Sequence, residues 1–174
     1  AVIKNENWMA SISMSGSRVA KYEAINGDNN SGWYTGDGMT YLYTDAEDYP
    51  NEFWSNVDYY FMPGTTVTNR ERVSENTKAM YFLTDREFVG GATLDEMMVV
   101  AMDFEGSGHD MEFQTSLTGK KAWFVFEGVI LCLGADINCS DGCEVYTVLE
   151  NRIIDGKDIS VDEDSNYITI PDYA

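Results

Sequence analysis

The sequence predicts an all-β protein, an antiparallel β-sandwich with almost no helix. Turn signals divide the chain into roughly eight to ten short strand-like segments, spaced about 8–12 residues apart, as in sandwich proteins. Residues 45–56 are the only helical candidate, and Pro50 suits a first helical turn there. Hydrophobic residues make up 44% of the 174 residues and aromatic residues 13%. We therefore expect residues 1–174 to form a single β-sandwich domain or a fragment of one.

The first third of the chain contains two predicted strands and a predicted extended segment. Apolar and polar residues alternate from Trp8 to Ser15, which predicts a strand, and residues 18–25 follow as an extended segment. Asn26-Gly27 is a turn signal of the hairpin kind. Residues 32–43 hold three glycines and four aromatic residues, and their second half, from Met39, predicts another strand. This glycine-aromatic stretch is either a rigid corner of the core or the wall of a cleft for a flat ligand such as a sugar ring.

The rest of the chain alternates between apolar segments and turns. Residues 58–67 form an aromatic segment that ends near a Pro-Gly turn, and Gly90-Gly91 marks another turn. Residues 69–80 are polar and charged, which is typical of an exposed excursion. Further strands are predicted at residues 97–104, 111–117, 122–126, 129–133, 144–149 and 166–170.

The segments 122–126 and 129–133 form the clearest predicted hairpin, joined by Glu127-Gly128. Both arms are nearly all apolar, so we expect both faces of this hairpin to be covered. Cys132 lies inside the second arm and is expected to be a buried free thiol. Cys139 and Cys143 flank a three-residue turn, and this spacing allows a small disulfide.

The charge of the chain excludes two classes of partner. There are 30 acidic and 11 basic residues, a net charge of −19. Binding to nucleic acid and to anionic membranes both depend on lysine and arginine. No apolar run approaches the roughly 20 residues of a membrane span. We expect neither nucleic acid nor membrane as a partner, and because Ala1-Val2-Ile3 reads as interior sequence, we expect a piece of a longer chain.

The sequence predicts no metal site and no cofactor. Two runs of alternating oxygen-bearing side chains, starting at Asn26 and at Asp162, lack the glycine and glutamate that an EF-hand loop requires. Three cysteines, one of them expected to be buried, and the single His109 do not supply the four ligands of a structural zinc site. His109 also lies in a Gly/Ser-rich loop, which is a poor place to hold a catalytic base.

Glu23 and Asn26 are the more interesting polar pair. They end an extended segment and open the turn before the glycine-aromatic stretch. A carboxylate and an amide at such an edge can orient a sugar or the arginine of a partner. The alternative is an ordinary turn with a surface glutamate.

Many short blocks together carry a resemblance to a known family. In their order over residues 8–152 they resemble the central β domain of polysaccharide lyase family 8, which contains hyaluronate, chondroitin AC and xanthan lyases. The blocks are Ser13-Met14-Ser15, Ser17-Arg18, Tyr22 to Asn29, Gly32 to Tyr43, Phe53-Trp54, Val57-Asp58, Met62 to Thr66, Phe88 to Gly91, Ala101 to Asp103, Lys120 to Phe124, Leu133 to Ala135 and Glu150 to Arg152.

The resemblance implies a secreted lyase that cleaves an acidic, uronic-acid-containing polysaccharide by β-elimination. In this family a helical α/α toroid precedes a large β "supersandwich". The toroid supplies a tyrosine that acts as base, an asparagine and a histidine at the substrate carboxylate, and an arginine. The sequence contains no helical repeat, so we expect these residues to be absent from it and the chain alone to be inactive.

The resemblance also assigns roles to residues of this chain. Glu23 matches a glutamate that reaches into the cleft, where it would orient the arginine or tyrosine of the toroid rather than act as the base. Asn26 matches an asparagine on the substrate side, and Arg18 would help to bind substrate. Trp33 and Tyr34 would bind substrate and shape the floor of the cleft, or would lock the interface between the domains. The acidic polysaccharide and the toroid are the implied partners. The alternative is a non-catalytic carbohydrate-binding or structural β-sandwich module.

Overall fold

The computed structural model describes residues 1–73, 81–126, 128–153, 160–162, 164 and 167–169. These residues form eleven strands and one helix. The elements are β1 (Val2–Lys4), β2 (Met9–Met14), β3 (Asp37–Tyr43), α1 (Asn51–Asn56), β4 (Thr66–Thr68), β5 (Val89–Leu94), β6 (Met97–Glu105), β7 (Thr118–Phe126), β8 (Val129–Asn138), β9 (Val145–Thr147), β10 (Ser160–Asp162) and β11 (Tyr167–Thr169).

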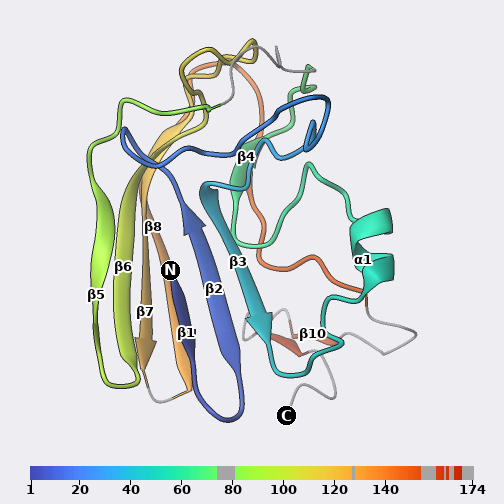
Figure 1. Ribbon diagram of the computed structural model, residues 1–174, viewed down its shortest axis with the longest axis vertical. Coiled ribbons are helices and arrows are strands. Elements are labelled where there is room, and N and C mark those ends of the chain that lie inside the picture. Colours follow the sequence, from blue (N-terminus) through green and yellow to red (C-terminus); the bar gives the residue numbers. More distant parts are fainter. Residues whose placement is uncertain (74–80, 127, 154–159, 163, 165–166, 170–174) are drawn as a thin grey trace.

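Two antiparallel sheets make up the body of the molecule (Figure 1). One sheet has the order β1-β2-β3 and the other the order β5-β6-β7-β8, and smaller ladders pair β4 with β9 and β10 with β11. The β7–β8 hairpin was predicted from its two apolar arms and is confirmed, with longer strands than expected. The all-β sandwich prediction is confirmed as well.

The main core lies between these two sheets. Ala10 and Ile12 of β2 point toward Val100 and Trp123 of the larger sheet, and all four side chains are buried. Burial alternates along β6 and β7, because successive side chains of a strand point to opposite faces. The inward face of each strand is therefore the one that forms the core.

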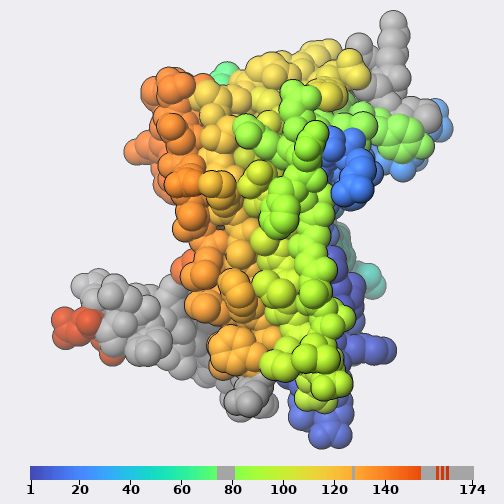
Figure 2. All heavy atoms as spheres, turned by 90° about the vertical axis from the view of Figure 1, so that its left-hand side faces the viewer, coloured from blue at the N-terminus to red at the C-terminus, as the bar shows by residue number. Residues whose placement is uncertain are grey.

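The outer face of the larger sheet is exposed (Figure 2). Phe124 and Phe126 of β7 are 37% and 41% exposed, and Leu131 of β8 is 45% exposed. The prediction that both faces of this hairpin are covered is therefore wrong for this chain, and Cys132 is exposed rather than buried. The apolar pattern shows that these strands suit a covered environment, but the described residues do not supply the cover.

One predicted extended segment and one predicted strand are loops in the structure. Residues 18–25 make only isolated bridges, such as that between Glu23 and Tyr81, because a tight turn between Gly16 and Val19 breaks the extended path. Residues 111–117 form no strand either. There the backbone N–H of Thr115 donates a hydrogen bond to the Ser107 side chain, and that of Ser116 donates to the Asp141 side chain. These N–H groups are therefore not available to a strand ladder.

Several element boundaries also differ from the predictions. Gly90 and Gly91 lie inside β5, and the turn comes later, where Asp95 has a φ of 50°. The helix α1 is shorter than predicted, with Pro50 at its N-cap. Of the predicted exposed excursion 69–80, Arg72 is buried and residues 74–80 lie outside the described residues. The last predicted strand, 166–170, matches β11, and its first and last residues likewise lie outside.

A search of the described residues finds no helix long and apolar enough to cross a membrane. Their single helix, α1, has six residues.

Candidate functional site

A long loop, residues 15–36, connects β2 to β3 and carries the candidate residues (Figure 1). Its Asn26-Gly27 turn is confirmed: Asn26 and Gly27 have φ values of 55° and 84°, and the Asp28 amide donates a 2.8 Å hydrogen bond to Ile25 O. This left-handed backbone suits asparagine and glycine. The turn brings Asn26 to an exposed position beyond Glu23.

Glu23 is exposed, and its backbone is fixed from two sides. Asn29 Nδ2 donates a 2.8 Å hydrogen bond to Glu23 O, and Glu23 pairs with Tyr81 in an isolated bridge. Arg18 is exposed too, but it lies in a different turn of the loop, between Gly16 and Val19. The fixed backbone of Glu23 and its exposed side chain fit a carboxylate presented to a partner.

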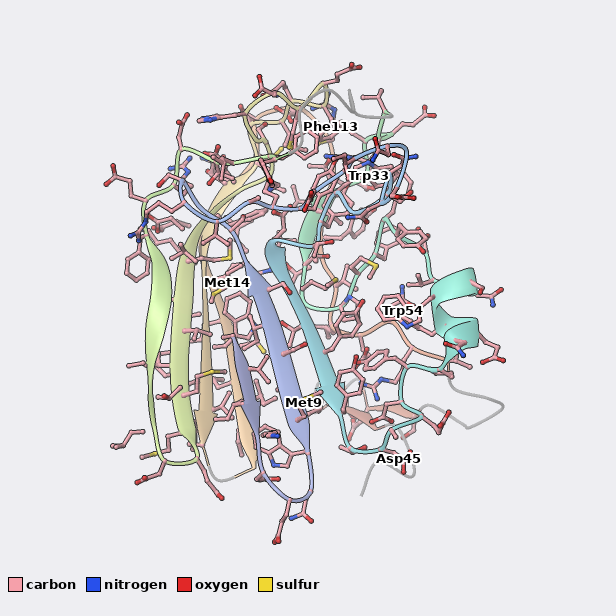
Figure 3. All side chains as sticks on the ribbon, in the orientation of Figure 1. Met9, Met14, Trp33, Asp45, Trp54 and Phe113 are labelled. Atoms are coloured by element: carbon pink, nitrogen blue, oxygen red, sulfur yellow. The ribbon has the colours of Figure 1, made fainter. Side chains whose placement is uncertain are left out.

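Trp33 and Tyr34 pack around a buried arginine that was not predicted. The guanidinium carbon of Arg72 lies 5.5 Å from the Trp33 ring centroid, 5.1 Å from that of Tyr34 and 4.0 Å from that of Phe113. Figure 3 shows Trp33 and Phe113 at the same end of the molecule. Trp33 is half-buried, whereas Tyr34 is only 4% exposed.

The burial of Tyr34 limits what it can do. Removal from water raises the pKa of its hydroxyl to about 12, so it stays protonated at neutral pH. Its ring lies inside this chain and stabilises the loop from within. A contact with substrate remains a prediction for the half-buried Trp33 and for the exposed Arg18, Glu23 and Asn26.

Beneath the loop lies a cluster of buried charges formed by Lys21, Asp37 and Lys121. The Lys21 ammonium contacts Asp37 Oδ1 and donates a 2.7 Å hydrogen bond to Glu105 O. Lys121 Nζ donates to Asp37 O at 3.1 Å and to Gly64 O. Charged side chains are rarely this buried. The only signals in the sequence were a lysine within a short apolar segment and an aspartate between two glycines.

Burial shifts the pKa values of this cluster. It raises the pKa of the Asp37 carboxyl, against the opposing effect of the Lys21 ammonium. It lowers the pKa of Lys121 to about 8, although Asp37 favours the charged form. Burial is the larger effect in both cases because it disfavours the charged form of each group.

The lowered pKa of Lys121 predicts a pH-dependent contribution to stability. Its pKa is about 8 in the folded chain and 10.5 when unperturbed, so between these values the unfolded chain binds more protons and the free energy of unfolding rises with pH. Relative to Lys121→Met, the wild-type chain should gain about 2 kcal/mol between pH 7 and 10. Urea unfolding at a series of pH values measures this difference.

The comparison with Lys121→Met is needed because other groups act in the opposite direction. Burial raises the pKa of Tyr34, and the partial shielding of the Cys132 sulfur from water raises the pKa of that thiol; both effects lower stability at high pH in both proteins. Lys120→Met is the matched control, since Lys120 lies next to Lys121 but is exposed. A wild-type curve that runs parallel to that of Lys121→Met would contradict the prediction.

Among the described residues, one group of side chains has the composition of a metal site. The ligand atoms of Cys139, Asp141 and Cys143 lie within 4.8 Å of one another, and the two sulfur atoms are 3.8 Å apart. The Asp141 carboxylate already accepts hydrogen bonds from Arg70, from Thr115 and from Ser116. Asp141 therefore connects separate loops through these hydrogen bonds. Three ligands are also fewer than the four of a structural zinc site.

Comparison with known proteins decides the family. Residues 1–170 match the model of the polysaccharide lyase family 8 super-sandwich domain. The chain belongs to polysaccharide lyase family 8. Both the resemblance found in the sequence and the fold expected from it are thereby confirmed, and the match extends beyond residues 8–152.

The sequence matches to family 8 relatives cover most of this chain. A hyaluronate lyase from Thermasporomyces composti is 36% identical over 155 residues, which cover 87% of this chain and 19% of that protein. A xanthan lyase from Bacillus sp. (strain GL1) is 33% identical over 158 residues, covering 90% of this chain and 16% of that protein. The chain thus spans less than a fifth of the length of these two lyases.

A solved family 8 structure shares the fold. The Streptomyces coelicolor A3 chondroitin AC lyase, in complex with chondroitin sulphate, superimposes with a TM-score of 0.80 and 32% sequence identity. The match covers 92% of this chain and 22% of that one. The β-sandwich described above is therefore a portion of the larger architecture of the family 8 lyases.

Proposed function

We propose that this chain is the β-domain portion of a lyase that cleaves an acidic, uronic-acid-containing polysaccharide by β-elimination. One observation carries the proposal: residues 1–170 match the family 8 super-sandwich domain, and the matching relatives are named as lyases of hyaluronate and xanthan. A chondroitin AC lyase with the same fold was solved with chondroitin sulphate. The substrate is expected outside the cell, and the enzyme is expected to be secreted.

The chemistry of β-elimination explains why a carboxylate on this loop is useful. Removal of the proton next to a uronic acid carboxylate is possible only when that carboxylate is neutralised by positive charges or hydrogen-bond donors. Glu23 would orient the arginine or the tyrosine of the helical toroid beside that carboxylate, accepting a charge-assisted hydrogen bond from it. It is exposed at the edge of the domain, where a second domain can reach it.

Asn26 and Trp33 would face the substrate in this arrangement. An amide accepts and donates hydrogen bonds to sugar hydroxyls, and an indole ring supports the face of a sugar ring. The net charge of −19 repels a polyanion, so the positive side of the cleft must come from the toroid. Without the catalytic groups and the positive charge of the toroid, the isolated chain is expected to be inactive.

An assay of the full-length polypeptide tests the proposal. It should convert hyaluronan, chondroitin sulphate or xanthan into products with the ultraviolet absorbance of an unsaturated uronic acid, whereas the 174-residue chain should not. Activity of the isolated chain would overturn the assignment of chemistry to the toroid. Binding of these polysaccharides by the isolated chain, with an inactive full-length protein, would favour a carbohydrate-binding module.

Replacing Glu23 tests its role within that enzyme. We expect Glu23→Ala in the full-length protein to lower kcat by about a hundredfold, because the donor it holds is left unoriented. The melting temperature should change little, because the Glu23 side chain is exposed. Glu96→Ala, in the turn between β5 and β6, is the matched control. Equal kcat values for the two variants would exclude Glu23 from the cleft.

A further inference from the structure

The buried charges below the candidate loop include a lysine with no exposed side-chain surface. Lys21 lies two residues before Glu23, with a side-chain exposure of 0%, and its partner Asp37 has 1%. Its ammonium contacts Asp37 Oδ1, donates to Glu105 O at 2.7 Å and lies 5.7 Å from the Phe104 ring centroid. Lys21 is therefore held by directional contacts from β3 and β6.

The two charged residues stand at the two ends of one loop. Lys21 precedes residues 22–36 and Asp37 follows them as the first residue of β3. The backbones also meet at this point: a Cβ atom at Gly36 would lie 2.5 Å from Lys21 Cα and 2.7 Å from Lys21 O. The ion pair and the glycine contact together close the neck of the loop.

The neck is fastened to both sheets of the sandwich. Asp37 belongs to the smaller sheet, and its backbone oxygen accepts a 3.1 Å hydrogen bond from Lys121 of β7. Lys21 reaches β6 of the larger sheet through Glu105 O. Outside the neck, Tyr22 stacks on Phe82 at 4.6 Å. These contacts fix the position of the loop relative to both sheets.

The enclosed loop carries four of the five predicted site residues. Glu23 and Asn26 are exposed on it, Trp33 is half-buried, and Tyr34 supports it from inside. Two apolar side chains of equal volume could fill the neck, but they would supply no directional bonds to fix its geometry. We propose that Lys21 and Asp37 are positioning residues, which set the place of Glu23 and Asn26 through the closed neck of this loop.

Amide hydrogen exchange of the 174-residue chain tests this inference. Lys21→Met should raise the exchange rate of residues 22–36 by about tenfold more than that of β6 and β7, because the neck opens locally. The control is Lys120→Met, which breaks an exposed ion pair with Asp136 whose partners are also 16 residues apart in the sequence. If the exchange rate of residues 22–36 rose no more than that of β6 and β7, the ion pair would stabilise the whole core rather than this loop, and the proposal would be wrong.

A double variant covers the case in which Lys21→Met fails to fold. Lys21→Met alone leaves the buried Asp37 carboxylate without the ammonium that contacts it, whereas Lys21→Met with Asp37→Leu removes both charges of this pair. The double variant should regain most of the lost melting temperature and still exchange faster in residues 22–36. Wild-type protection of that loop in the folded double variant would overturn the proposal.

The catalytic consequence rests on the proposed function and is measured separately. In the full-length enzyme the double variant should lower kcat by about tenfold with less than about a twofold change in KM, because a displaced Glu23 weakens transition-state contacts. An unchanged kcat beside fast exchange would show that the neck does not position the catalytic groups. An inactive wild-type enzyme would contradict only the proposed function, because hydrogen exchange tests the neck without any substrate.

Discussion

Replacing Trp123 with alanine is expected to lower the free energy of unfolding of this chain by about 3–5 kcal/mol. Trp123 is 2% exposed and lies on the inward face of β7, in the core between the two sheets. Its ring also approaches Lys121, whose ammonium lies 5.7 Å from the ring centroid. Truncation removes a large apolar surface and leaves a cavity that strands on both sides prevent from closing. Urea unfolding measures the loss.

The neighbouring Phe124 provides the matched control. It follows Trp123 on the same strand but points to the outer face, where it is 37% exposed. Phe124→Ala should cost less, about 1–2 kcal/mol, because more than a third of this side chain is already in water and its removal leaves no enclosed cavity. Equal costs at the two positions would mean that the outer face is covered, and a dependence of stability on protein concentration would identify self-association as the cause.

The same contrast explains how far the sequence predicted the fold. Strand positions followed from apolar patterns, as at Met9–Met14 and in the hairpin of β7 and β8. Periodicity identifies strands because their side chains alternate between faces. It does not reveal whether a given apolar face meets this chain or something else. Phe126 and Leu131 are apolar, so their sequence predicted a covered face, but no described residue of this chain covers them and they are exposed.

The two segments wrongly predicted to be extended have a common cause. Residues 18–25 and 111–117 contain apolar residues at suitable spacing, yet their backbones are held by local bonds and distant partners. An example is the Lys21 amide, which donates to Phe82 O at 2.8 Å although no ladder continues there. Tertiary contacts of this kind outweigh a local preference for extended structure.

The candidate site was predictable only in part. The Asn26-Gly27 turn has a strong local signal, and the structure contains it. The burial of Lys21 has only a weak signal, its place within a short apolar segment, and the burial of Arg72 has none, because charged residues are normally exposed. What places them inside is the meeting of segments far apart in sequence, such as Lys21 with Glu105. The roles of Arg18, Glu23, Asn26 and Trp33 toward substrate depend on a second domain, and sequence and structure leave them as predictions.

Replacing Gly38 with alanine should destabilise the chain by about 2–5 kcal/mol, the sum of a backbone and a packing cost. Gly38 has a φ of 88°, which side chains other than glycine adopt with strain of about 1–2 kcal/mol. The added Cβ atom would also lie 2.8 Å from two ring carbons of Trp123 and 2.9 Å from Lys121 Nζ. Neither neighbour can retreat easily, because both side chains are buried.

Gly27→Ala separates the two costs. Gly27 has nearly the same φ, 84°, but a Cβ atom there would meet nothing within 4 Å. Its alanine variant should lose only the backbone part, about 1–2 kcal/mol. The difference between the variants in urea unfolding then measures the close approach of β3 to Trp123. If the two losses were equal, the chain could relax around Gly38, and the contact of this glycine with the core would not be what restricts the position to glycine.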